Sequence, residues 1–326
     1  MSDREIVCGD LNLALDGLRR EGFRLDVIYP ADDPHTAILT RAGESVRLTT
    51  QDGAPSPSSE LPGFVPQFVL TRAGDTSGEG RAGMLYRDLI PSRLGGRYIA
   101  SHITIPEGGP VADWVHFHRV AFQMIYVRKG WVRVVYEDQG EPFVMHAGDM
   151  VLQPPEIRHR VLESSAGLEV IENGSPALHA TCAEHEMSLP NGRLDPARDF
   201  GGQRFLRHVA ADTPWTEFYG AEAQESAMYD ATGGLASVRT VRPGGSSTIA
   251  FDSHDGELVF GFVLEGSARL DHADGSIIGS ADAFVIPPGE TWSLGGVSND
   301  LRLLHVTTRR LGQRTATQEQ KILRSS

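Results

Sequence analysis

Cysteine and aromatic residues are scarce in this chain of 326 residues. Its two cysteines, Cys8 and Cys182, cannot form a disulfide framework, and they lack the close spacing of a thiolate metal site. Phe, Trp and Tyr together make up 7% of the residues, whereas the chain holds 36 Gly and 19 Pro. Because Gly and Pro favour turns, this composition predicts many short strands rather than long helices.

Basic residues and long apolar runs are also few. Lys and Arg number 30 against 43 Asp and Glu, and the resulting net charge of -13 argues against nucleic acid or an anionic membrane as the main partner. No stretch approaches the ~20 apolar residues of a membrane span. The first residues are charged where a signal peptide needs an apolar run. We therefore predict a cytoplasmic protein that does not enter a membrane.

The first part of the chain differs in pattern from the rest. Residues 10–20 place leucines at helical spacing, with Asp10 as a plausible N-cap, and three short strand patterns follow up to residue 50. The segment 51–63 is rich in Pro, Ser and Gly, as a linker or exposed loop is. These features predict a small α+β lobe and linker over residues 1–62.

The remainder of the chain contains an internal repeat. From about Arg97 short strand patterns alternate with turns, which indicates an antiparallel sandwich or barrel. Residues 116–130 align without gaps on residues 252–266, and residues 147–159 align on residues 280–292. The offset falls only from 136 to 133 residues, as a hairpin shorter by three residues would produce. The repeat therefore predicts two like barrels in tandem.

Closely spaced histidines suggest a metal site in the first copy. His116 and His118 lie two residues apart on a predicted strand, where alternation sends both side chains to one face. Gln123 follows five residues later, and His159 lies after a turn on a later strand. These four side chains could converge. Three neutral imidazoles with open positions suit a first-row transition metal better than Mg or Ca.

These residues resemble the motifs of the cupin superfamily, and in particular of cupins with two barrels. The first cupin motif has a His-x-His pair, a Glu and a Gly; its positions are held here by His116, His118, Gln123 and Gly130. The second motif has a Gly, a Pro-x-Gly turn and a His; its positions are held here by Gly148, Pro154, Glu156 and His159. The resemblance implies tandem double-stranded β-helix (jelly-roll) barrels. It also implies that the three histidines hold a divalent metal inside the first barrel.

The chain departs from the family pattern at several ligand positions. Gln123 stands where the family has a carboxylate ligand, so either its amide oxygen is a fourth ligand or it supports a site of three histidines. In the second copy the four ligand positions are held by Asp252, His254, Val259 and Trp292. These offer too few donors for a transition metal. We therefore predict a metal-binding barrel over residues 63–200 and a degenerate barrel without metal over residues 201–326.

Further candidates for catalysis lie on the strand before the first motif. Tyr98 and His102 share one face of that strand and either line the cavity or are exposed. Together with Gln123 they are the candidate catalytic residues. Tyr126 and Arg128 point away from the face of Gln123, which predicts that they are solvated.

Several functions fit this pattern. The resemblance to three-His cupin dioxygenases implies a non-haem Fe(II) enzyme that cleaves a small chelating substrate, such as an enediol, a diketone or a hydroxylated aromatic acid. An isomerase, lyase or decarboxylase would use the metal as a Lewis acid, and Mn, Ni or Zn would serve as well. A cupin that only binds a small ligand is a third class. We expect an anionic small-molecule substrate, and a homodimer formed through an edge of the N-terminal lobe.

Overall fold

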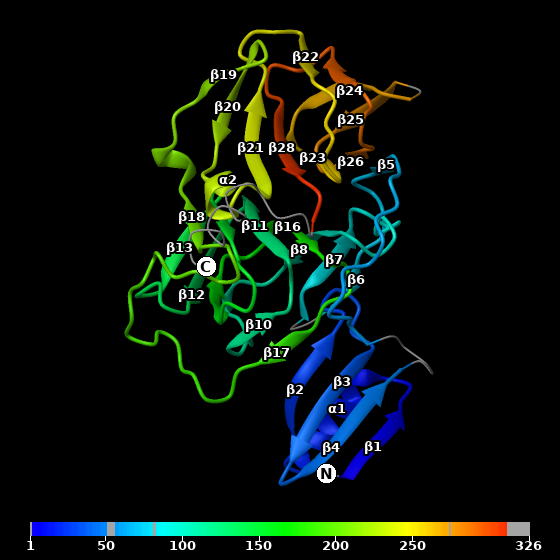
Figure 1. The fold of residues 1–326 in the computed structure, drawn as a ribbon, viewed down its shortest axis with the longest axis vertical. Helices are drawn as coiled ribbons and strands as arrows, with labels where there is room; N and C mark the ends of the chain where they lie inside the picture. The colour runs from blue at the N-terminus through cyan, green and yellow to red at the C-terminus, as the bar shows by residue number, and fades with distance from the viewer. Residues whose placement is uncertain (1, 51–55, 81–82, 274, 312–326) are drawn as a thin grey trace, which may run out of the picture.

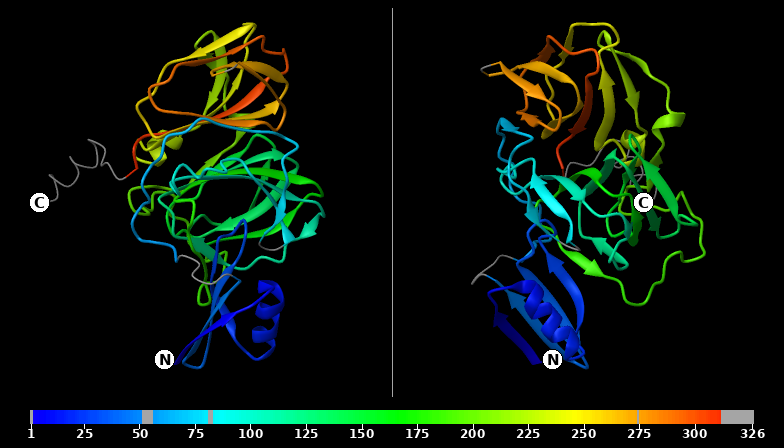
Figure 2. Two further views of the ribbon diagram at one scale, coloured as in Figure 1. Left: turned by 90° about the vertical axis from the view of Figure 1, so that its right-hand side faces the viewer. Right: turned by 180° about the vertical axis from the view of Figure 1, so that it is seen from behind.

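The computed structural model describes residues 2–50, 56–80, 83–273 and 275–311. They form a small lobe and two barrels, with the lobe at one end and the second barrel at the other (Figures 1 and 2). Four sheets build these parts, and the α-helices among the described residues are α1 (Leu11–Arg20) and α2 (Met228–Ala231). The prediction of a mainly β fold is therefore confirmed. Neither helix is long and apolar enough to cross a membrane.

The N-terminal lobe is a sheet covered on one face by helix α1. Its elements are β1 (Ser2–Val7), α1, β2 (Arg24–Tyr29), β3 (Thr36–Arg41) and β4 (Glu44–Thr49). Asp10 caps the helix, because its side chain accepts a hydrogen bond of 3.0 Å from the backbone NH of Leu13. Strand β2 also pairs with β17 (Thr181–Ala183) of the first barrel. The lobe is thus joined to the first barrel by a continuous sheet.

The first barrel is built from two sheets that share an apolar core. One sheet continues from β17 through β10 (His116–His118), β15 (His159–Ser164), β12 (Trp131–Tyr136) and β13 (Phe143–His146), and β9 (Gly109–Pro110) pairs with β15. The other contains, in order, β18 (Leu206–His208), β14 (Met150–Leu152), β11 (Phe122–Lys129), β16 (Leu168–Ser175), β8 (Ile99–Ile105), β7 (Leu85–Asp88) and β6 (Gly78–Glu79).

The second barrel repeats this plan with a sheet of seven strands and a sheet of four. The larger sheet contains, in order, β19 (Thr216–Phe218), β20 (Ala221–Glu225), β21 (Ala236–Arg242), β28 (Arg302–Thr308), β23 (Leu258–Glu265), β26 (Ala283–Ile286) and β5 (Val69–Thr71). The smaller contains β22 (Thr248–Phe251), β27 (Trp292–Gly295), β24 (Ser267–Asp271) and β25 (Ser276–Gly279).

The predicted repeat is present in most of the strands, although residues 252–254, which align on β10, form no strand. Strand β23 begins 136 residues after β11, and β25 begins 133 residues after β13, so the shorter hairpin is the one that follows β24. Glu156, which replaces a family glycine, adopts φ of 60°, and its counterpart Gly289 adopts 80°. Because only glycine adopts this backbone region without strain, Glu156 keeps the turn at a small energetic cost.

Two strands belong to a different barrel from the one that their position along the chain predicts. Strand β5 falls in the segment 63–200 but pairs with β26 of the second barrel. Strand β18 falls in the segment 201–326 but pairs with β14 of the first barrel. Each barrel is therefore completed by a strand from beyond the boundary predicted from the sequence.

The face of strand β11 that was expected to be solvated is covered by the second barrel. Tyr126 is buried in a core that also holds Phe262 and Leu304. Arg128 donates a hydrogen bond of 2.8 Å to Ser280 Oγ, and its guanidinium lies over the ring of Phe262. The expectation for Tyr126 and Arg128 is thus corrected, because contact between the barrels replaces solvent on this face.

Candidate metal centre

The three histidines of the two motifs meet inside the first barrel. His116 and His118 lie on β10, and His159 opens β15, which pairs with β10 at His116. One nitrogen of each ring lies within 4.8 Å of the others, and all three side chains are buried. The alternation of β10 and the pairing with β15 therefore produce the cluster that the sequence predicts.

Protein groups hold the Nδ1 atoms of these rings. Nδ1 of His116 and Nδ1 of His159 lie 2.7 and 3.0 Å from the carbonyl oxygen two residues earlier in the chain. Because a carbonyl only accepts, both rings donate from Nδ1 and carry the lone pair on Nε2. Thr181 Oγ1 lies 3.2 Å from Nδ1 of His118. Such contacts orient imidazoles for metal binding through Nε2.

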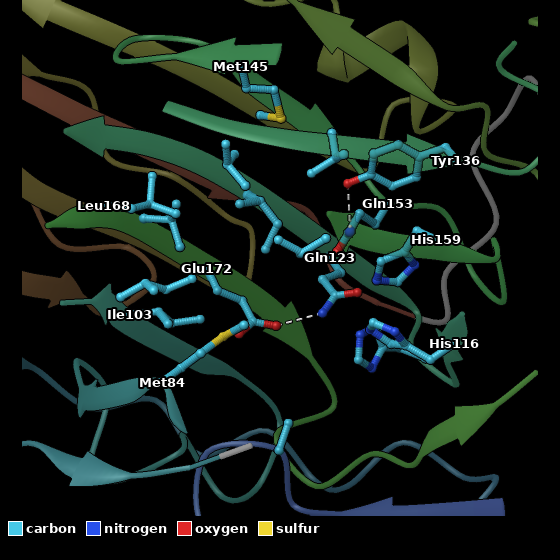
Figure 3. A pocket seen from close by; sticks show the side chains of 18 of the residues that line it. Met84, Ile103, His116, Gln123, Tyr136, Met145, Gln153, His159, Leu168 and Glu172 are labelled. Atoms are coloured by element: carbon cyan, nitrogen blue, oxygen red, sulfur yellow. Dashed lines mark hydrogen bonds between the residues drawn. The ribbon is translucent and has the colours of Figure 1, made fainter. Parts of the chain in front are cut away.

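Gln123 adds an amide to this cluster. It lies on β11 and is 2% exposed, and its Nε2 donates a hydrogen bond of 2.6 Å to Glu172 Oε1. Its Oε1 is buried and has no hydrogen-bond partner among the described residues. Figure 3 shows this amide between Glu172 and the rings of His116 and His159. An oxygen left in this position fits a fourth, neutral ligand of a divalent metal.

Glu172 is a candidate site residue that the sequence analysis does not identify. It lies on β16, lines the same cavity as Leu168 and Val170, and is 8% exposed. Strand alternation over residues 168–172 is the sequence feature that could have identified Glu172, since it puts this carboxylate on the same face as Leu168 and Val170. The site thus has a carboxyl group next to the amide that stands where the family has its carboxylate ligand. From this position a carboxylate would offset part of the charge of a divalent metal bound by three histidines and an amide.

Removing the charge of Glu172 should weaken metal binding. We expect Glu172→Gln to lower the affinity for Zn²⁺ by roughly tenfold to a hundredfold, the usual effect of losing a group that supports a ligand. The introduced amide still accepts a hydrogen bond from Gln123, so the variant tests the charge. Calorimetric titration with Zn²⁺ measures the effect.

An exchange variant supplies the control. Gln123→Glu combined with Glu172→Gln restores one carboxylate and one amide in reversed order, and it should recover most of the lost affinity. Wild-type affinity in Glu172→Gln alone would show that the carboxylate does not support the metal.

A mostly apolar cavity extends from the histidine cluster. The volume of this cavity is about 100 Å³. On the same measure a single water molecule needs about 10–15 Å³. Gln153 also lines it and donates a hydrogen bond of 2.8 Å to the hydroxyl of Tyr136. Burial raises the pKa of Tyr136, so this phenol stays protonated at neutral pH. The cavity therefore has the size and the polarity to enclose a small organic molecule.

Tyr98 and His102 lie outside this cavity. The hydroxyl of Tyr98 contacts Glu257 and Thr308 of the second barrel. His102 contacts Glu169, and burial together with the nearby Arg87 lowers the pKa of His102 to about 4. Both side chains share one face, as expected, but that face is turned toward the second barrel. Neither residue therefore lines the cavity among the described residues, and their catalytic role stays a prediction.

Aromatic rings fill the matching region of the second barrel. Trp292, the counterpart of His159, stacks on Phe251 with ring centroids 3.9 Å apart. By strand register His305 is the counterpart of Glu172. Burial lowers the pKa of His305 to about 3, so this imidazole is neutral. Within the described residues, the only group of His, Cys, Asp and Glu close enough to hold a metal is the one in the first barrel.

Comparisons with known proteins agree with this architecture. Residues 101–171, which include all three histidines, match the family model described as Cupin domain. No curated protein matches the sequence significantly.

Several solved structures share the fold. Protein Ylba from E. coli is 12% identical, with a TM-score of 0.53 over 77% of this chain and 94% of that chain. A candidate glyoxylate-induced protein from Pseudomonas aeruginosa is 12% identical, with a TM-score of 0.55 over 81% and 97%. A mutant of Bacillus subtilis oxalate decarboxylase is 11% identical, with a TM-score of 0.52 over 80% of each chain. Residues 101–171 therefore match a cupin domain that holds the histidine cluster, and the chain shares the two-barrel fold of these solved structures.

Proposed function

We propose that this protein is a metal-dependent enzyme whose substrate is a small molecule that chelates the metal as an anion. The observation that carries the proposal is the donor set at one end of the cavity. Three buried histidines lie together there, and the buried amide oxygen of Gln123 has no hydrogen-bond partner among the described residues. A donor set of imidazoles and one amide oxygen suits Fe(II), Mn, Ni or Zn.

The residues of the site would have different roles in such an enzyme. His116, His118, His159 and Gln123 would hold the metal, which would polarise oxygen atoms of the substrate and lower the pKa of a bound water. Glu172 would keep the Gln123 amide oriented through its hydrogen bond to Nε2. Gln153 Oε1, which is buried without a hydrogen-bond partner among the described residues, would accept a hydrogen bond from the substrate. The apolar walls would exclude water from the reacting atoms.

Oxygen-dependent cleavage of the substrate by an Fe(II) enzyme is the first specific candidate. In such a dioxygenase reaction both atoms of O₂ enter the product. An apolar cavity favours this chemistry because it protects reactive species from water. The two acid/base candidates that would have favoured other chemistry, Tyr98 and His102, lie at the contact between the barrels.

Decarboxylase, lyase or isomerase action is the second candidate, and Glu172 favours it. The structure places a carboxylate among the residues that line the cavity, and Lewis-acid reactions need a group that accepts or returns a proton. Oxalate decarboxylase shares the fold at 11% identity, which leaves its reaction as one possibility within this class.

Oxygen consumption distinguishes the two candidates. Protein loaded with Fe(II) should consume O₂ in the presence of an enediol, a β-diketone or a hydroxylated aromatic acid, and should be inactive without O₂. Turnover of the same panel under nitrogen, with Mn²⁺ or Zn²⁺ bound, would assign the Lewis-acid class. Protein that binds none of these metals would contradict the whole proposal.

A further inference from the structure

The cavity of the first barrel has two chemically different ends. The histidines, Gln123, Gln153 and Glu172 form a polar end. Away from it the wall is formed mostly by apolar side chains, which include Ile103, Val132, Val134, Met145, Leu168 and Val170. Figure 3 shows His116 and His159 on one side of the cavity and Ile103 and Leu168 on the other. A ligand that spans the cavity therefore meets a metal-binding end and a hydrocarbon end.

Charge distinguishes the two ends as well. Among the described residues that line the cavity there is no Lys or Arg, and the one carboxylate is that of Glu172. A second anionic group on a ligand, placed beyond the metal, would lie against apolar side chains without a cationic partner. Burying such an unpaired charge is strongly unfavourable. A hydrocarbon group in the same place would gain about fourfold in affinity for each methylene removed from water.

We propose that the substrate has a single anionic chelating head and an apolar tail of a few carbon atoms. This inference rests on the proposed function, because the head is placed by the metal. The tail lies along the wall formed by β8, β12 and β16, which contribute Ile103, Val134 and Leu168. The cavity volume of about 100 Å³ limits the tail to a few carbon atoms. Longer dianions such as 2-oxoglutarate, whose second carboxylate would lie against the apolar wall, are disfavoured as substrates.

Straight-chain 2-oxo acids test the tail. With Co²⁺-loaded protein, calorimetric titration should show affinity rising about fourfold per methylene from pyruvate upward, until the tail fills the cavity. The visible spectrum of Co²⁺ reports separately whether the head reaches the metal. Affinity that does not change with chain length, while the spectrum changes, would overturn the inference and leave the proposed function standing. A spectrum that no 2-oxo acid changes would instead contradict the proposed function.

A pair of isosteric ligands tests the charge. The ligand 5-methyl-2-oxohexanoate has an isopropyl group where 2-oxoglutarate has its second carboxylate. We expect it to bind at least tenfold more tightly, and equal or tighter binding of 2-oxoglutarate would overturn the inference.

Two valine substitutions locate the tail. Val134→Thr adds a hydroxyl to the cavity wall and should weaken binding of the longest tight-binding 2-oxo acid about tenfold, while leaving pyruvate unchanged. Val127→Thr is the control, because Val127 is a buried valine of the same barrel that does not line the cavity. Equal effects of both variants would mean that the tail does not contact this wall.

Discussion

His116→Ala should abolish metal binding to the isolated protein. His116 is one of three buried imidazoles within 4.8 Å of one another, and its Nδ1 is held by a backbone carbonyl. Removing one ligand leaves two imidazoles and an amide, so we expect affinity for Zn²⁺ to fall by roughly a hundredfold or more. Metal content after purification and calorimetric titration with Zn²⁺ both measure the loss.

His254→Ala is the matched control for this experiment. His254 is the counterpart of His118 in the second barrel, where Trp292 and Phe251 occupy the interior. This variant should bind Zn²⁺ as the wild type does. Equal loss of metal in both variants would show that the assignment of one site to the first barrel is mistaken.

Glu257→Gln should cause a large loss of stability. The carboxylate of Glu257 accepts hydrogen bonds of 2.9 Å from Nε and Nη2 of Arg97, and both side chains are almost completely buried. The hydroxyl of Tyr98 donates to the same carboxylate. The substitution leaves the guanidinium buried without its counter-charge, which costs about 3–5 kcal/mol of the free energy of unfolding. Equilibrium unfolding in urea measures this change.

An exposed ion pair provides the comparison. Arg133 and Glu163 pair across two strands of the first barrel with both side chains substantially exposed. Glu163→Gln should therefore change the free energy of unfolding by about 0–1 kcal/mol. If Glu257→Gln and Glu163→Gln destabilise the protein equally, the buried pair of Arg97 and Glu257 contributes no more to the free energy of unfolding than an exposed pair does.

The internal repeat made much of the fold predictable. A gapless match of residues 116–130 with 252–266 requires two copies of one unit, and the strands of the two copies follow one another in the same order along the chain. The histidine cluster was predictable for a similar reason. His116 and His118 are separated by one strand period, and a period of two fixes the face on which both side chains lie.

Contact between the barrels explains what the sequence could not predict. Alternation puts Tyr98 and His102 on one face, yet it does not say whether that face meets the cavity, solvent or another domain. The second barrel covers it, and the aromatic ring of Phe262 packs against His102 with centroids 5.6 Å apart. Tyr126 was assigned to solvent for the same reason. A pattern along one strand holds no information about a partner surface from a distant part of the chain.

Glu172 could not be predicted from the sequence for a different reason. Strand geometry puts it on the face of Leu168 and Val170, but a single carboxylate on an otherwise apolar face is uncommon and belongs to no motif. Its role became visible only when register placed it beside Gln123, where it accepts a hydrogen bond of 2.6 Å. Gln123 thus replaces the carboxylate ligand of the family, and the buried carboxylate of Glu172 is hydrogen-bonded to the amide that replaces it.

The exchange of strands between the barrels has a consequence for synthesis on the ribosome. Strand β5 pairs with β26, and Thr71 Oγ1 donates to the carbonyl of Ala283 across 212 residues of chain. The segment that carries β5 therefore emerges long before its partner exists, and it must wait while the first barrel is made. The sheet that contains β5 can be completed only after β26 has been translated, and neither barrel corresponds to one continuous stretch of chain.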